Sequence, residues 1–244
     1  MKKIFLFFCL MGMAVACCNN SKESSQAVVT RNDFLGNTKV ITKAEQDRLT
    51  PQKVLDMLKE GNKIYADDKL TIRNTTQRIK DAAKGQYPKA VVLSCLDSRV
   101  PVEDVFNQGI GDLFVARVAG NINNPDMLGS MEFACNVSGS KLILVLGHDY
   151  CGAVAAAIND VELGNITGLL SRIKPAVASA SASFTGEKSA SNPKFMDAVC
   201  LHNVKHVIND IRLNSPILKG MEEKGEIMIV GAVYNLETGK VDFL

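Results

Sequence analysis

Two apolar runs in this 244-residue chain each lead into side chains that bind metals. The run from Ala90 to Leu93 is followed by Cys95, and the continuous run from Leu142 to Leu146 is followed by His148 and Cys151. A continuous apolar run bounded by turns is typical of a parallel strand that is buried on both faces. Because parallel strands are joined by crossover helices, these runs favour an α/β architecture.

The rest of the chain alternates between strand-like and helix-like segments. Strands are expected over 90–94, 113–118, 142–146 and 226–234, and helices over 50–61, 70–84, 126–137, 153–161 and 195–213. Thr50 can cap the first helix, Pro51 suits its first position and Gly61 is expected to end it. The predicted fold class is therefore α/β, with a mainly parallel β-sheet flanked by helices. Ligands of such sheets bind at the carboxyl ends of the strands, so Cys95 and His148 are expected to converge.

The composition fits one ordinary globular domain, because 46% of the residues are hydrophobic and 22% are charged. A net charge of +2 and the absence of a basic stripe argue against a nucleic-acid partner.

The first residues are typical of an export signal. Lys2 and Lys3 precede an apolar segment, 4–16, that is too short to span a bilayer. It ends in Ala14-Val15-Ala16-Cys17, which resembles the cleavage box of bacterial lipoproteins, with Cys17 as the lipidated residue. The alternative is an ordinary secretory signal with incidental cysteines.

This interpretation divides the chain into a signal peptide at 1–16, a flexible tether at 17–45 and a domain at 46–244. It places the mature protein in the bacterial cell envelope or periplasm, in contact with a membrane only through the lipid anchor. An oxidising compartment allows a disulfide between Cys135 and Cys200. We expect instead that both are buried as small hydrophobic residues, since a core of this size needs no such link.

Cys95, His148 and Cys151 form a ligand set suited to Zn²⁺, and three protein ligands leave a fourth position open, as in catalytic zinc sites. Asp97 lies two residues after the first cysteine and can either bind the metal or accept a proton beside it. If Arg99 forms a bidentate pair with Asp97, it holds the carboxylate off the metal and keeps it ionised. His202 and His206 lack the glutamate of a zinc-binding helix motif and are interpreted as surface residues.

Several segments together resemble the β-class carbonic anhydrases, in particular the plant-like subgroup, from about Thr50 to Leu244. The matching segments are Leu58 to Tyr65, Gly85 to Pro88, Cys95-x-Asp97-x-Arg99, Ala119 to Asn121, His148-x-x-Cys151-Gly152, Ser215 to Leu218 and Gly231 to Gly239. The resemblance implies one zinc ion per subunit and the reversible hydration of CO₂ to bicarbonate and a proton. It also implies that Asp97 and Arg99 form a catalytic dyad, and that Asp97 becomes the fourth zinc ligand in a closed form.

The same resemblance implies homodimers, or larger assemblies of dimers such as tetramers, with the site at the subunit boundary. It assigns substrate-binding roles to Gln86, Phe114, Phe133 and Gly152, although Phe133 occupies a position where the subgroup often has tyrosine. Two other functions stay open at this point. One is hydrolysis of CS₂ or COS on the same fold, and the other is zinc or bicarbonate binding without turnover.

Overall fold

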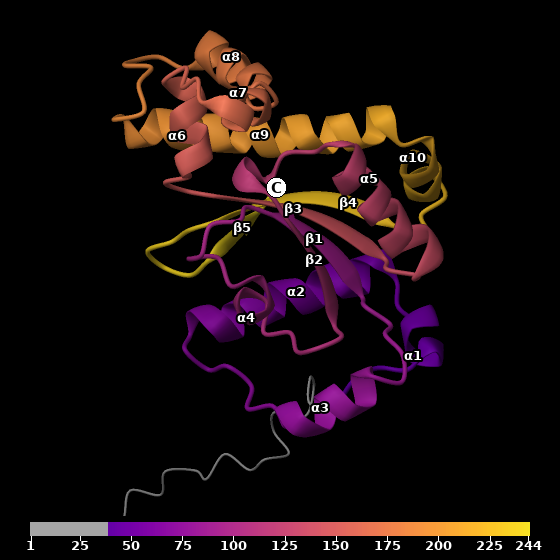
Figure 1. Ribbon diagram of the computed structural model, residues 1–244. Coiled ribbons are helices and arrows are strands. Elements are labelled where there is room, and N and C mark those ends of the chain that lie inside the picture. The colour runs from indigo at the N-terminus through magenta and orange to yellow at the C-terminus, as the bar shows by residue number, and fades with distance from the viewer. Residues whose placement is uncertain (1–38) are drawn as a thin grey trace, which may run out of the picture. The chain divides into compact units, whose positions relative to one another are not determined.

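The computed structural model describes residues 39–244 (Figure 1), so the predicted signal peptide, Cys17 and most of the predicted tether lie outside the described residues. Five strands of the described residues form one sheet in the order β2-β1-β3-β4-β5. The strands are β1 (Ala90–Ser94), β2 (Leu113–Arg117), β3 (Leu142–His148), β4 (Met228–Tyr234) and β5 (Val241–Phe243). The first four pair in parallel and β5 is antiparallel to β4, which confirms the predicted mainly parallel sheet.

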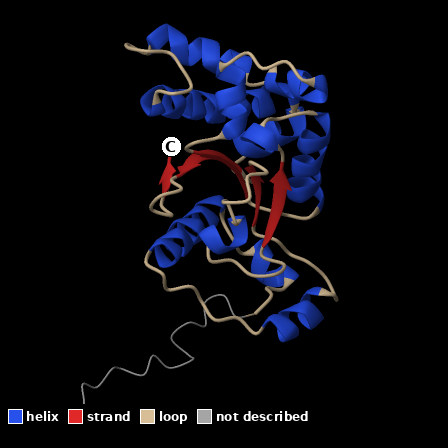
Figure 2. Cartoon of the chain, turned by 60° about the vertical axis from the view of Figure 1, so that its left-hand side comes forward, coloured by secondary structure: helices blue, strands red, loops and turns tan. Residues whose placement is uncertain are grey.

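Helices cover both faces of this sheet (Figure 2). They are α1 (Lys43–Asp47), α2 (Pro51–Ala66), α3 (Thr75–Ala82), α4 (Val102–Val105), α5 (Pro125–Glu132), α6 (Gly152–Ile158), α7 (Gly164–Leu170), α8 (Lys174–Ser183), α9 (Pro193–Asn214) and α10 (Pro216–Glu223), with short helical turns at Ala119–Asn121 and Phe133–Val137. Figure 1 shows α2 and α4 on one face, and α5, α9 and α10 on the other. No helix among residues 39–244 combines the length and the apolar character that crossing a bilayer requires.

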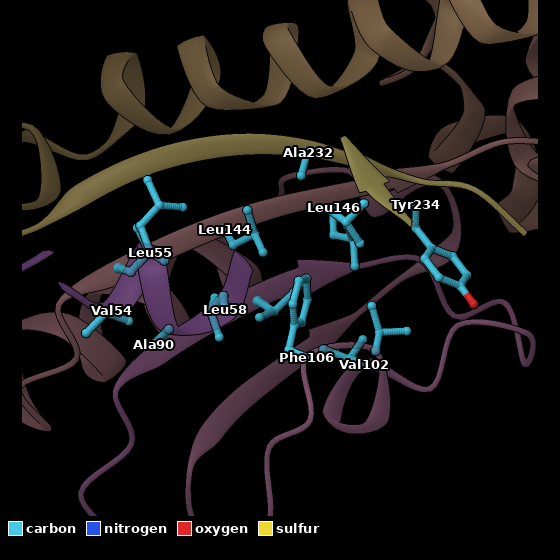
Figure 3. Packing of buried hydrophobic residues seen from close by; sticks show 14 of the residues in the cluster. Val54, Leu55, Leu58, Ala90, Val102, Phe106, Leu144, Leu146, Ala232 and Tyr234 are labelled. Carbon is cyan, nitrogen blue, oxygen red and sulfur yellow. The ribbon is translucent and has the colours of Figure 1, made fainter. Parts of the chain in front are cut away.

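The two faces of the sheet have separate cores because alternate strand residues point in opposite directions. Leu58 of α2 and Phe106 pack against Leu144 and Leu146 on one face (Figure 3). Val91, Leu93 and Val145 face the other way, toward α9 and α10. The central strands are therefore buried on both sides, as their continuous apolar sequence predicts.

Gly61 does not end its helix, contrary to the sequence-based expectation, because α2 continues to Ala66. A Cβ atom at Gly61 would lie 2.0 Å from the carbonyl oxygen of Phe106. The glycine is therefore required for a close approach between α2 and the segment after α4, and not for a change of chain direction.

Two further glycines bring α9 close to the sheet. At Gly147 of β3, an added Cβ atom would lie 2.8 Å from one methyl group of Val204. At Gly231 of β4, it would lie 2.7 Å from the other methyl group of the same valine. No ordinary side chain fits at either position unless α9 moves. The helix consequently lies directly over the end of β3 that carries His148.

A buried ion network joins the segments that lead into β1 and β2. Asp112 accepts from Lys89 Nζ at 2.7 Å and from Arg78 Nη2 at 2.7 Å, and all three side chains are almost completely buried. Lys89 also donates to Gln108 Oε1 at 3.0 Å. Burial lowers the pKa of Lys89, and the charge of Asp112 opposes that change.

The folded part begins earlier than the predicted boundary at residue 46. Thr42 and Glu45 form a capping box at the start of α1, and the Gln46 side chain is buried and donates to the carbonyls of Pro88 and Ser138. The short helices α4, α7 and α10 are also absent from the sequence-based prediction.

The described cysteines are all free. Cys135 packs in the core under α9 and α10, whereas Cys200 is buried beside His148, to whose carbonyl its thiol donates at 3.3 Å. Burial raises the pKa of each of these two thiols to about 12. The expectation that both are buried, unpaired residues is confirmed.

Candidate metal centre

Cys95, His148 and Cys151 come together at the carboxyl ends of β1 and β3. The strands are neighbours in register, with Ser94 opposite Leu146, so the residues that follow them meet at one edge of the sheet. The ligand atoms of the three side chains all lie within 4.8 Å of one another, and all three residues are buried. The predicted convergence is confirmed.

The His148 ring presents one nitrogen to this cluster. Its Nδ1 lies 2.7 Å from the carbonyl oxygen of Asp149, which fixes Nδ1 as the protonated nitrogen. The other nitrogen, Nε2, is buried and has no hydrogen-bond partner among the described residues. A neutral imidazole oriented by a backbone carbonyl, with its second nitrogen unpartnered beside two sulfurs, fits a zinc ligand.

The surroundings shift the pKa values of the two cysteine thiols in opposite directions. A hydrogen bond from Cys151 lowers the pKa of Cys95 to about 4, and the Gly120 amide donates to Cys95 Sγ at 3.3 Å. The hydrogen bond with Cys95, together with burial, raises the pKa of Cys151. The surroundings thus favour thiolate at Cys95, the form that binds zinc.

Asp97 and Arg99 form the bidentate pair that the sequence suggests. Arg99 Nε and Nη2 donate to the two carboxylate oxygens at 2.9 and 2.7 Å, and the Arg99 amide also donates to Asp97 Oδ1 at 2.9 Å. These bonds, the side-chain one above all, hold the pKa of Asp97 at about 2. Asp97 Oδ2 is 3.8 Å from His148 Nε2, so the carboxylate lies beside the ligand cluster in its ionised form.

Arg117, which the sequence-based analysis missed, supports this loop from the neighbouring strand. Its Nε donates to the carbonyl of Cys95 at 3.0 Å and its Nη2 to the carbonyl of Asp97 at 2.5 Å. Arg117 ends β2 directly opposite Ser94. No local sequence signal could have found it, because only the register of the sheet places the last residue of β2 beside the residue before Cys95.

The expected substrate residues are arranged differently from the metal ligands. Phe114 and Phe133 pack edge to face, with ring centroids 6.4 Å apart, and both line an open depression of about 730 Å³ along β2. Gln86 is exposed and precedes β1, whereas Cys95 follows it, so the strand separates them by roughly 15 Å. Gly152 begins α6 directly after Cys151. The structure therefore does not bring Gln86 to the cluster of its own chain.

The comparisons with known proteins agree with this geometry. The family model described as carbonic anhydrase matches residues 90–241. This chain belongs to the carbonic anhydrase family. The carbonic anhydrase of Mycolicibacterium smegmatis is 33% identical over 191 residues, which cover 76% of this chain and 89% of that protein. Carbonic anhydrase 2 of Mycobacterium tuberculosis is 35% identical over a match that covers 75% of this chain and 87% of that protein.

Solved structures place the chain among the β-carbonic anhydrases. The Coccomyxa β-carbonic anhydrase in complex with acetazolamide has a TM-score of 0.63 and 27% identity, and the match covers 76% of this chain and 83% of that one. A tetrameric β-carbonic anhydrase of Sordaria macrospora shares the fold, with a TM-score of 0.62 and 23% identity over 76% and 93% of the two chains. The β-carbonic anhydrase described here is an enzyme that hydrates CO₂ to bicarbonate.

Proposed function

We propose that Cys95, His148 and Cys151 hold one zinc ion per subunit, and that Asp97, held by Arg99, is the acid–base group beside it. The observation that carries this proposal is the buried Nε2 of His148, which has no hydrogen-bond partner among residues 39–244, belongs to a cluster with the two cysteine sulfurs and lies 3.8 Å from an ionised carboxylate. When bound, zinc supplies Lewis acidity that lowers the pKa of water and provides a nucleophile near neutral pH.

The chain's own residues then manage the proton and the position of the carboxylate. Arg99 keeps Asp97 ionised and turned toward the guanidinium, so Asp97 can accept a hydrogen bond or a proton without binding the metal. This bidentate arrangement supports an open form. In a closed form, Asp97 would leave Arg99 and become the fourth ligand.

A second copy of the chain completes the substrate pocket in this proposal. Gln86 is separated from its own cluster by the length of β1, and Phe133 is 52% exposed beside the open edge of β2. Aromatic surface suits CO₂, which has no net dipole. We therefore propose a homodimer in which Gln86, Phe114 and Phe133 act at the partner's metal centre, with Gly152 shaping the backbone near it. A larger assembly of such dimers, such as a tetramer built from two of them, is consistent with the Sordaria relative, which is itself tetrameric.

Assignment to the plant-like subgroup belongs to the same proposal. Gln86 supplies an amide suited to bicarbonate, and the chain contains no tryptophan for the effector site of the bicarbonate-regulated subgroup. Phe133 in place of tyrosine removes one hydrogen bond to the substrate but leaves the metal ligands unchanged.

Export with a lipid anchor on Cys17 is proposed from the sequence alone. The basic residues, the short apolar segment and the Ala-Val-Ala-Cys box support it. Palmitate labelling of the full chain tests it, because wild type should be labelled and recovered with membranes, whereas Cys17→Ala should be unlabelled. Equal labelling of both proteins would show that Cys17 is not the anchor.

Stopped-flow CO₂ hydration by the zinc-loaded protein tests the proposed roles of the dyad. Asp97→Asn should lower kcat/KM about a hundredfold, since it keeps the shape but removes the acid–base group. Its zinc content should equal that of wild type, and Asp56→Asn on the exposed face of α2 is the matched control. Near-normal turnover in Asp97→Asn would reject the acid–base role. CS₂ in the same assay tests the alternative substrate.

A further inference from the structure

Tyr150 stands between two of the proposed metal ligands and has an uncommon backbone conformation. Its φ angle is 48°, in the left-handed region, and its side chain is half exposed. Glycine and asparagine enter this region readily, whereas a bulky aromatic residue stays there only when its surroundings hold it. The contacts that hold Tyr150 therefore indicate what its conformation is used for.

The left-handed conformation accompanies a contact with the dyad. The Tyr150 carbonyl accepts a hydrogen bond from Arg99 Nη2 at 3.3 Å, and the same nitrogen donates to Asp97 Oδ2 at 2.7 Å. Arg99 is thus held from two sides, although its side chain is 54% exposed. If the backbone at Tyr150 changed conformation, Arg99 would lose its contact outside the dyad.

The Tyr150 side chain is tied to the turn between β4 and β5. Its hydroxyl donates to Glu237 Oε1 at 3.3 Å. That turn is itself ordered, because Asn235 Oδ1 accepts from the amides of Glu237 and Thr238 at 3.1 and 2.8 Å. The residue before Tyr150 is held by the same turn, since the Leu236 amide donates to Asp149 Oδ1 at 2.9 Å.

We propose that Tyr150 and Glu237 are positioning residues that hold Arg99, and through it Asp97, from the β4–β5 turn. Neither residue touches the reacting atoms. The phenol bond to Glu237 keeps Tyr150 in its left-handed conformation, and this conformation directs the carbonyl at Arg99. The consequence for turnover rests on the proposed dyad, but the effect on Arg99 itself does not.

Hydrogen exchange of the Arg99 Nε–H, followed by ¹⁵N NMR in the zinc-loaded enzyme and assigned with Arg99→Lys, measures this restraint directly. An exposed hydrogen bond of this kind corresponds to a factor of about two to ten. Tyr150→Phe and Glu237→Ala should each speed exchange by about that factor, and the double variant should exceed neither. Glu237→Gln keeps an acceptor for the phenol and should match wild type. Tyr65→Phe, which loses a phenol bond to Tyr234 instead, is the control.

The route through the backbone has its own test. Tyr150→Asn adopts the left-handed conformation without a tether, so Glu237→Ala should have no effect on exchange in that background. Unchanged exchange in Tyr150→Phe, or faster exchange on adding Glu237→Ala to Tyr150→Asn, would overturn the inference.

Activity separates this inference from the proposed role of the dyad. The variants that speed exchange should lower kcat by about two- to tenfold, with KM and zinc content unchanged. In an Arg99→Lys background, the same substitutions should have no further effect on kcat. Faster exchange with unchanged kcat would confirm the positioning contact and reject the proposed catalytic role of Arg99.

Discussion

The two ends of the parallel strands differ in how their buried polar groups are paired. At the amino ends, the carboxylate of Asp112 pairs with both Lys89 and Arg78 inside the protein. At the carboxyl ends, His148 Nε2 is buried close to Cys95 and Cys151 and has no hydrogen-bond partner in the described part of the chain. One end therefore supplies its own counter-charges, whereas the other has donor atoms arranged for an ion. Side chains suited to a soft metal ion, and not buried charge alone, distinguish the candidate metal centre from the ion network.

Substitution at the carboxyl ends should affect chemistry far more than folding. Cys95→Ser should abolish stable zinc binding and lower kcat/KM at least about a thousandfold, because the Lewis acid is lost. Zinc content by atomic absorption and stopped-flow hydration measure the two effects, and circular dichroism checks the fold. A variant that loses zinc but keeps its turnover would contradict the assignment of the carboxyl-end cluster as the catalytic metal site.

Substitution at the amino ends should have the opposite effect. Asp112→Ala removes the carboxylate that pairs with the buried Lys89, which should cost about 3–5 kcal/mol of unfolding free energy in urea. Zinc content and turnover per folded molecule should stay near wild type. Loss of zinc in a fully folded Asp112→Ala protein would contradict the proposed separation of the two ends.

The same variant has a predictable pH dependence. Burial already lowers the pKa of Lys89, and loss of Asp112 removes the charge that opposes this shift. The unfolded chain then binds more protons than the folded one below the ordinary lysine pKa. The stability deficit of Asp112→Ala should therefore shrink as the pH rises from about 7 to about 9.5. A deficit that grows over this range would show that Lys89 does not carry the penalty.

Mixed dimers test whether Gln86, at the amino end of β1, acts at the metal centre of the other subunit. Gln86→Ala and Cys95→Ser dimers should both be impaired. If Gln86 acts across the boundary, a purified mixed dimer holds one fully intact site and should regain about half of wild-type activity. If it acts within its own chain, neither site is intact. Differently tagged copies and stopped-flow hydration distinguish these results.

The sequence predicts the metal cluster well because its parts are local. Each ligand follows an apolar run that could form only a buried strand, and parallel neighbours bring their carboxyl ends together. The bidentate pair of Asp97 and Arg99 also depends only on residues two apart. By contrast, Arg117 contacts this loop from another strand, so its role depends on sheet order and register, which the sequence does not specify.

The helix ends were harder to predict for a related reason. Gly61 has the same local signal whether it ends a helix or admits the Phe106 carbonyl, and only the tertiary contact distinguishes the two. The same holds for Lys89, whose burial depends on Gln108 and Asp112, which follow it by 19 and 23 residues. The signal peptide, the anchor and most of the tether are predicted from sequence and lie outside the described residues.

The close packing of α9 on β3 has a consequence for how substitutions in the helix will be observed. Val204 and Cys200 fill the space above Gly147, and the Cys200 thiol contacts the carbonyl of His148. A larger side chain at any of these positions would displace the last residues of β3, including the imidazole of His148. Zinc affinity would then depend on the packing between α9 and β3. Variants selected for weak metal binding would include substitutions in a helix that contributes no ligand.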